Sequence, residues 1–100
     1  RRALTMRESQ FQGKLIKAIK DKFPGAVVMK NDSSYIQGIP DLTILYNNHW
    51  AMLECKKSST ASHQPNQDYR VNELNNMSFA SFICPENMEE TLDAMAQSFD

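Results

Sequence analysis

Residues 38–57 read GIPDLTILYNNHWAMLECKK, two apolar segments separated by Asn47-Asn48. Asn tolerates the left-handed backbone that two-residue hairpin loops require, so this stretch predicts a β-hairpin. A two-residue loop there places Asp41 directly opposite Glu54 at the open end of the hairpin. Side chains opposed in this way have Cβ atoms about 5 Å apart, where two carboxylates repel by on the order of 3 kcal/mol at an effective dielectric of about 20.

A cation near Asp41 and Glu54 would cancel this repulsion. Side chains alternate along a strand, so Lys56 lies on the same face as Glu54. Mg²⁺ prefers oxygen ligands and keeps several waters, which suits two neighbouring carboxylates. A lysine beside such a metal can orient an attacking water or offset charge on a phosphate. The pattern predicts metal-assisted phosphodiester hydrolysis; the alternative is that these are surface charges on an ordinary hairpin.

The rest of the chain predicts an α/β domain. Hydrophobic periodicity and turn residues indicate a helix over 8–23, a strand over 26–29, a helix over 67–76, a strand over 77–84 and a helix over 88–99. The third strand, the following helix and the fourth strand form a βαβ unit, so those two strands should be parallel. The expected fold is a mixed four-stranded sheet flanked by helices.

These motifs resemble those of a known superfamily. Pro40-Asp41 with Glu54-Cys55-Lys56 is similar to the PD-(D/E)xK nuclease motif, and the order αβββαβ is the restriction-endonuclease-like core of that superfamily. Gly38 ahead of the acid, and Pro65-Asn66-Gln67 opening the crossover helix, look like the virus-type replication–repair nuclease (VRR-NUC) domain. The likeness is greatest to its small free-standing phage members.

The resemblance implies roles for the hairpin residues. Asp41 and Glu54 would bind Mg²⁺ or Mn²⁺, and the main-chain carbonyl of Cys55 would be a further metal ligand. The Cys55 thiol, on the opposite face of the strand, would belong to the core. Lys56 would position the attacking water or stabilise charge on the phosphate.

Two further residues have competing interpretations. Glu8 falls on the apolar stripe of the first helix and should point inward or toward a cleft, where the resemblance makes it a helix-borne catalytic acid; it could equally be a first-turn acid favoured by the helix dipole. Gln67 would match a helix glutamine that contacts the site or the DNA backbone, or else it caps the helix or faces solvent. Gln64 is near enough to be confused with it.

The charge distribution bears on DNA binding, since the net charge is only −1. Lysines concentrate in the first part of the chain and acids at its end, which predicts one basic and one acidic side. Phosphate contacts of this kind position DNA without reading its sequence and are salt-dependent. The candidates for such contacts are Lys14, Lys17, Lys30, Lys57 and Arg70.

The chain of 100 residues is expected to form one domain. Residues 1–5 are expected to be a cloning-derived or disordered leader, with the nuclease domain over 6–100 and Met6 as the native start. Cys55 and Cys84 are expected to be buried free thiols, as in a reducing cytoplasm. No apolar run approaches the roughly 18 residues that a membrane helix needs.

The resemblance implies a Mg²⁺-dependent DNA endonuclease. Its expected substrate is branched DNA such as a four-way (Holliday) junction, cut by a homodimer during phage replication, recombination or repair in the bacterial host cytoplasm. The main alternative is a non-cleaving module on a nuclease-like fold that binds nucleic acid or a protein. A structural subunit that holds Ca²⁺ is a third reading, but two or three side-chain oxygens are few for that ion.

Overall fold

The computed structural model describes residues 7–100, so the predicted leader and the start at Met6 lie outside the described residues. The elements in chain order are α1 (Glu8–Lys22), β1 (Val27–Lys30), β2 (Leu42–Tyr46), β3 (His49–Cys55), α2 (Pro65–Met77), β4 (Phe79–Ile83), the short 3-10 helix η2 (Pro85–Asn87) and α3 (Met88–Ser98). This order confirms the predicted αβββαβ core with a final helix.

The four strands form one sheet in the order β1-β2-β3-β4. β2 and β3 are antiparallel with Tyr46 paired to His49, and Asn47 has the left-handed backbone, φ 55°, that the turn was expected to need. β3 and β4 are parallel, as the βαβ connection predicts. The hairpin register ends at Leu42 paired with Leu53, so the next positions along the two chains are Asp41 and Glu54.

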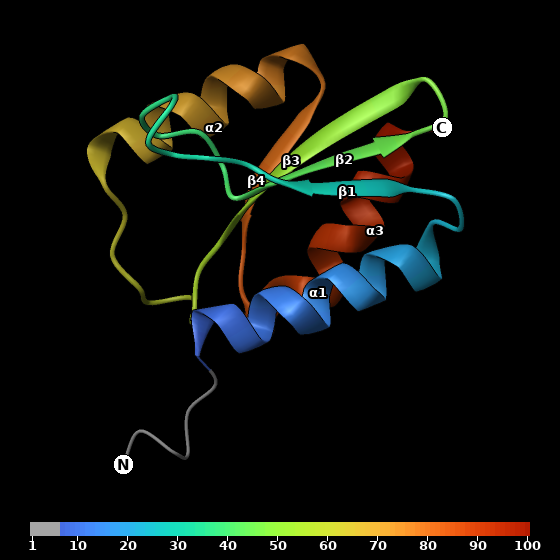
Figure 1. Cartoon of the computed structure of the whole chain (residues 1–100), viewed down its shortest axis with the longest axis horizontal. Helices are drawn as coiled ribbons and strands as arrows, with labels where there is room; N and C mark the ends of the chain where they lie inside the picture. The colour runs from blue at the N-terminus through green and yellow to red at the C-terminus, as the bar shows by residue number, and fades with distance from the viewer. Residues whose placement is uncertain (1–6) are drawn as a thin grey trace.

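Helices cover both faces of the sheet: α1 and α3 lie on one side and α2 lies on the other (Figure 1). Side chains of β3 alternate between these layers. Ala51, Leu53 and Cys55 are buried in the larger core with α1 and α3, whereas Trp50 and Met52 pack in the smaller core beneath α2. Because Glu54 alternates with Leu53 and Cys55, it lies on the α2 face, at the end of the sheet.

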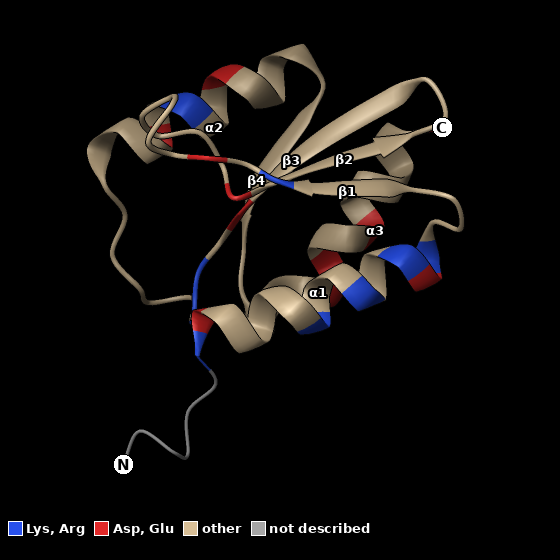
Figure 2. Ribbon diagram, viewed as in Figure 1, with Lys and Arg blue, Asp and Glu red and all other residues tan. Residues whose placement is uncertain are grey.

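The predicted separation into a basic and an acidic side is wrong. α1 carries the lysines and α3 carries acids, but both helices pack on the same face of the sheet, side by side (Figure 2). Lys22 at the end of α1 forms an ion pair with Asp93 of α3 at 2.9 Å. The sequence could not reveal this pairing, since it depends on the sheet face to which the last helix returns.

Two composition-based expectations hold for the described residues. Cys55 and Cys84 are both buried free thiols. Among residues 7–100, no helix has the length and apolar character needed to cross a membrane.

Candidate active site

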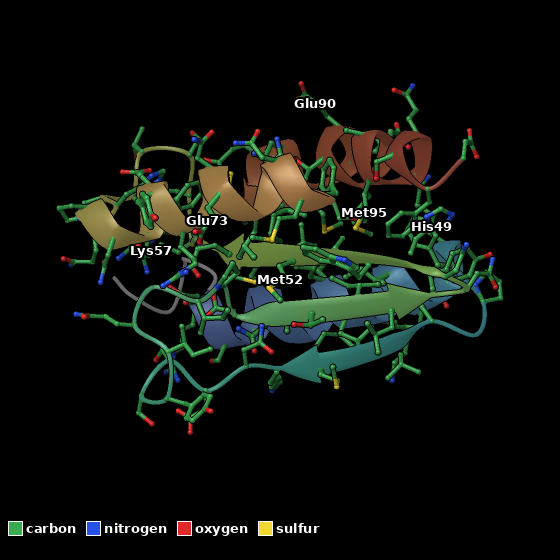
Figure 3. The ribbon with its side chains drawn as sticks, turned by 90° about the horizontal axis from the view of Figure 1, so that it is seen from above. His49, Met52, Lys57, Glu73, Glu90 and Met95 are labelled. Atoms are coloured by element: carbon green, nitrogen blue, oxygen red, sulfur yellow. The ribbon has the colours of Figure 1, made fainter. Side chains whose placement is uncertain are left out.

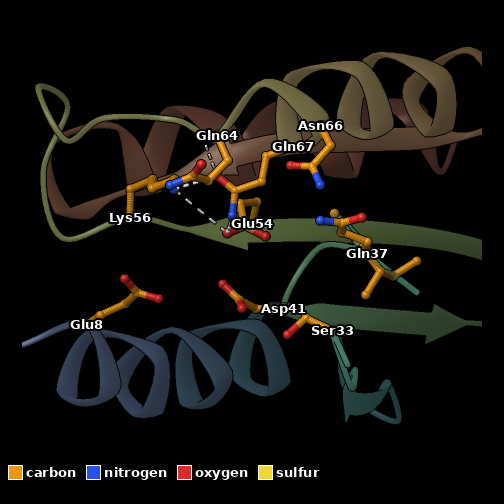
Figure 4. Close-up of a pocket in the computed structure, with 11 residues that line it drawn as sticks. Glu8, Ser33, Gln37, Asp41, Glu54, Lys56, Gln64, Asn66 and Gln67 are labelled. Atoms are coloured by element: carbon orange, nitrogen blue, oxygen red, sulfur yellow. Dashed lines mark hydrogen bonds and ion pairs between the residues drawn. The ribbon is translucent and has the colours of Figure 1, made fainter. Parts of the chain in front are cut away.

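A polar pocket of about 430 Å³ opens at the end of the sheet where Asp41 and Glu54 lie (Figure 4). Four parts of the chain line it: the first residue of α1, the loop before β2, the open end of the hairpin and the start of α2. The lining residues are Glu8, Ser33, Gln37, Gly38, Ile39, Asp41, Glu54, Lys56, Gln64, Asn66 and Gln67. The structure therefore brings all five predicted catalytic side chains to one pocket.

Asp41 is fixed to the neighbouring strand by its own carboxylate. The backbone N–H of Cys55 donates a hydrogen bond to Asp41 Oδ2 at 2.9 Å. In an extended strand the N–H and C=O of one residue point to the same side, so the Cys55 carbonyl also points toward Asp41. The next N–H, that of Lys56, points the other way and bonds to the carbonyl of Ile83 in β4 at 2.8 Å. This orientation is the one required of Cys55 as a main-chain ligand.

Gln67 links Lys56 to Glu54. Its side-chain oxygen accepts hydrogen bonds from Lys56 Nζ at 2.8 Å and from the backbone N–H of Gln64 at 3.1 Å. Its amide nitrogen donates to Glu54 Oε2 at 3.0 Å. Two donors on one side and a carboxylate on the other determine which way the amide faces. Lys56 Nζ lies 3.9 Å from Glu54 Oε2, so the three side chains form one connected group.

The site holds its carboxylates under electrostatic strain. Glu54 is only 4% exposed, and its pKa is raised to about 7. Burial is the larger cause of this shift, and the nearby charge of Asp41 is the second. Burial also raises the pKa of Asp41, although the hydrogen bond from Cys55 and the charge of Lys56 act against this. A bound cation would favour the ionised form of both groups. The strain that the hairpin register predicted is therefore present in the folded chain.

Glu8 reaches the pocket from the start of α1, as its place on the apolar stripe predicted. Burial is the main cause that raises its pKa, and the charge of Asp41 adds to it. Glu8 does not complete a cluster of three metal-binding side chains, since residues 7–100 contain no such group of His, Cys, Asp or Glu. It borders the site formed by Asp41 and Glu54 but stands apart from them (Figure 4).

The donors present fit Mg²⁺ or Mn²⁺. Two carboxylates and one carbonyl supply three oxygen ligands, and the polar pocket leaves room for the waters that Mg²⁺ retains. Asp41, which is half-buried, and Glu54, which is buried, repel each other. Lys56 is their neighbouring cation, and this lysine also bonds to Gln67. Asp41, Glu54 and the Cys55 carbonyl are the groups that would hold such an ion.

Asn31 supports Asp41 and was missed by the sequence reasoning. Its backbone N–H donates to the Asp41 carbonyl at 2.7 Å, and its side-chain nitrogen donates to the Pro40 carbonyl at 2.9 Å. Its side-chain oxygen accepts a hydrogen bond from the Thr43 hydroxyl at 2.9 Å. One residue after β1 thus binds the chain on both sides of Asp41. Its place in a polar run, Lys30–Ser34, gave the sequence no signal for this role.

The five predicted DNA-contact residues come from α1, the end of β1, the segment after β3 and α2. Lys30 ends β1, opposite Leu42 and next to the loop that lines the pocket. Lys57 lowers the pKa of Glu8, which places its charge near the pocket, and Figure 3 shows it at the end of the molecule away from His49. The side chain of Lys14 is exposed on α1. Lys17 forms an ion pair with Asp21, and Arg70 forms one with Glu73.

A solved structure described as "VRR_NUC domain" has a similar fold. It superposes with a TM-score of 0.62 at 20% sequence identity, over 81% of this chain and 92% of that one. No protein-family model and no curated protein matches the sequence. The likeness shows that this chain has the VRR_NUC fold, and it confirms the restriction-endonuclease-like α/β architecture that the resemblance predicted.

Proposed function

We propose that the chain is a Mg²⁺-dependent DNA endonuclease. The observation that carries the proposal is the convergence of Asp41, Glu54 and Lys56 on one pocket at the open end of the hairpin, with Gln67 bonded to two of them. The name of the structural neighbour, a VRR_NUC domain, supports the same activity. The raised pKa values of the half-buried Asp41 and the buried Glu54 support a cation site, because a bound cation would favour the ionised form of both groups.

Each residue has a distinct task in the proposed reaction. Mg²⁺ held by Asp41, Glu54 and the Cys55 carbonyl would supply Lewis-acid stabilisation of the phosphate charge. The ammonium of Lys56 is hydrogen-bonded to Gln67 and lies beside Glu54. There it orients the attacking water and offsets charge on the phosphate. Gln67 holds the side chains of Lys56 and Glu54 in a fixed relative position. Glu8 borders the pocket. There it would order water at the edge of the site.

The substrate and assembly follow from the resemblance. We propose branched DNA, with the four-way junction as the first choice, and a homodimer that presents two such pockets. Lys30 and Lys57 are the phosphate contacts best placed beside the pocket. A monomeric mass by light scattering at micromolar concentration would contradict the dimer without affecting the nuclease.

The competing proposal is a module that binds DNA or a protein and does not cleave. The Asp41→Ala variant separates the two on a panel of labelled four-way junction, flap, single strand and linear duplex, in Mg²⁺ and in Mn²⁺. The nuclease predicts that wild type cleaves at least one substrate and that Asp41→Ala cleaves none. A binding module predicts uncut DNA with wild type and equal affinity in both proteins.

A further inference from the structure

A second hollow, of about 420 Å³, lies beside the candidate active site. Its walls are largely apolar: Tyr35, Ile36, Ile39 and Met52 line it, with Asn31 and Asp32 as its polar members. Ile39 also lines the active-site pocket, so the two hollows share a wall. Met52, labelled in Figure 3, lies on the α2 face of β3 and packs against the smaller core.

The loop that presents Tyr35 is held in place by hydrogen bonds. Asp32 Oδ1 accepts from the Ser34 N–H at 2.9 Å, and the Asp32 carbonyl accepts from the Tyr35 N–H at 3.1 Å. Ile39 N–H bonds back to the Ile36 carbonyl at 3.2 Å. The Tyr35 side chain is nevertheless 84% exposed. A loop with its own internal hydrogen bonds therefore presents a large aromatic ring to solvent.

The other end of this loop lies close against the start of α2. Gly38 has a φ of +82°, and a Cβ atom there would stand 2.8 Å from the Asn66 carbonyl oxygen. The backbone thus approaches the start of α2 more closely than any other residue type would allow. Gly38 and Asn66 both line the active-site pocket, so the loop packs directly beside the catalytic residues.

We propose that this hollow takes an unpaired nucleobase from the DNA beside the bond to be cut, with the base stacked on Tyr35. An aromatic face with aliphatic walls suits the flat, largely apolar faces of a base, and such stacking is tolerant of sequence. A base enters only when it is unstacked, which happens at bulges, flaps and branch points. The inference rests on the proposed nuclease function. It would explain in structural terms why such a nuclease prefers branched DNA.

A second copy of this chain is the other occupant to consider, because Val27, Met29 and Leu45 are also exposed apolar residues on the sheet. Those residues do not line the hollow. The hollow instead adjoins the pocket that would hold the phosphate, through Ile39 and the loop that carries Tyr35. A nucleotide joined to that phosphate is therefore the ligand that the position favours.

The test compares a duplex that carries one unpaired 2-aminopurine with the same duplex fully paired. Binding is measured by anisotropy with Ca²⁺ in place of Mg²⁺, and stacking by 2-aminopurine fluorescence, with intact DNA verified by electrophoresis. Wild type should prefer the unpaired base by about tenfold, the effect of one stacked base. Tyr35→Phe should keep that preference, and Tyr35→Ala should lose it while binding paired duplex as before. Met77→Ala is the matched control, because Met77 is also largely exposed but ends α2 far from the hollow.

Three results would overturn the proposal. The first is an unchanged preference in Tyr35→Ala, and the second is no preference in wild type that still binds both duplexes. The third is a Tyr35→Ala protein that loses self-association in sedimentation while its preference persists, which would assign the hollow to contacts between copies. Failure of wild type to bind either duplex would instead count against the nuclease function itself, so the two claims fail in different ways.

Discussion

The side-chain oxygen of Gln67 accepts a hydrogen bond from the Lys56 ammonium at 2.8 Å, and this bond joins α2 to the end of β3. The same amide donates to Glu54 at 3.0 Å, so Gln67 holds a lysine and a carboxylate in fixed relation. Such a residue positions catalytic groups and need not touch the substrate.

Gln67→Ala should therefore lower the rate of cleavage by about ten- to a hundredfold, the usual cost of removing a supporting hydrogen bond around a metal site. Affinity for DNA should change little, because the amide is engaged with Lys56 and Glu54. Single-turnover rates and binding curves separate the two effects. Asn72→Ala, an exposed position on the same helix, is the control. Equal rates in Gln67→Ala and wild type would remove this residue from the site.

The stability of the metal-free protein should depend on pH through Glu54. Its pKa is raised from 4.5 to about 7 in the folded chain, so the folded state holds this proton more tightly than the unfolded state. The free energy of unfolding should fall as pH rises from about 4.5 to about 7, by on the order of 3 kcal/mol. Mg²⁺ should restore stability at pH 8, because it binds the folded state.

Urea unfolding in chelator at pH 5 and at pH 8 measures this effect. Glu54→Gln should show a smaller decrease between the two pH values than wild type. Asp41 and Glu8 also have raised pKa values, and both remain in the variant, so the difference between the two proteins isolates Glu54. A wild-type decrease no larger than that of Glu54→Gln would show that this carboxyl is not strained.

Asn31 should matter for metal affinity. Asn31→Ala removes the side-chain bonds to Pro40 and Thr43 and loosens the segment that carries Asp41. Calorimetric titration with Mn²⁺ should show roughly tenfold weaker binding, in line with other residues that orient metal ligands. Thr43→Val, which removes one of the same bonds, should weaken binding less, and the exposed Asn76→Ala should have no effect. Unchanged Mn²⁺ affinity in Asn31→Ala would contradict a positioning role.

Two glycines should respond to alanine in opposite directions. Gly38→Ala meets a left-handed backbone and the Asn66 carbonyl, and it should destabilise the fold by about 2 kcal/mol or more. Gly13 lies within α1 and a Cβ there meets nothing within 4 Å, so Gly13→Ala should stabilise by roughly 0.5–1 kcal/mol. Thermal unfolding of both variants checks the pair. A neutral Gly38→Ala would show that the loop does not approach α2 as closely as described.

The hairpin and its register were predictable because local rules decide them. Asn47-Asn48 specifies the turn, alternation specifies the faces, and together they place Asp41 beside Glu54. The parallel pairing of β3 and β4 followed from the length of the connection. These features need only residues close in sequence.

The remaining parts of the site depend on tertiary packing. Asn31 acquires its partners only when β1 pairs with β2, and the contact of Gly38 with Asn66 exists only when the loop meets α2. The sequence alone left open whether Gln67 faces solvent, because it does not fix the rotation of α2 about its own axis. The charge prediction failed for the same reason, since α3 returns to the face where α1 lies and pairs Asp93 with Lys22.

The most direct test of the central claim is cleavage of a labelled four-way junction in Mg²⁺, by wild type and by Lys56→Ala, with and without chelator. We expect wild type to make symmetric nicks that disappear in chelator and fall steeply in Lys56→Ala. An uncut junction bound equally by both proteins, together with uncut flap, single-stranded and duplex DNA, would contradict it.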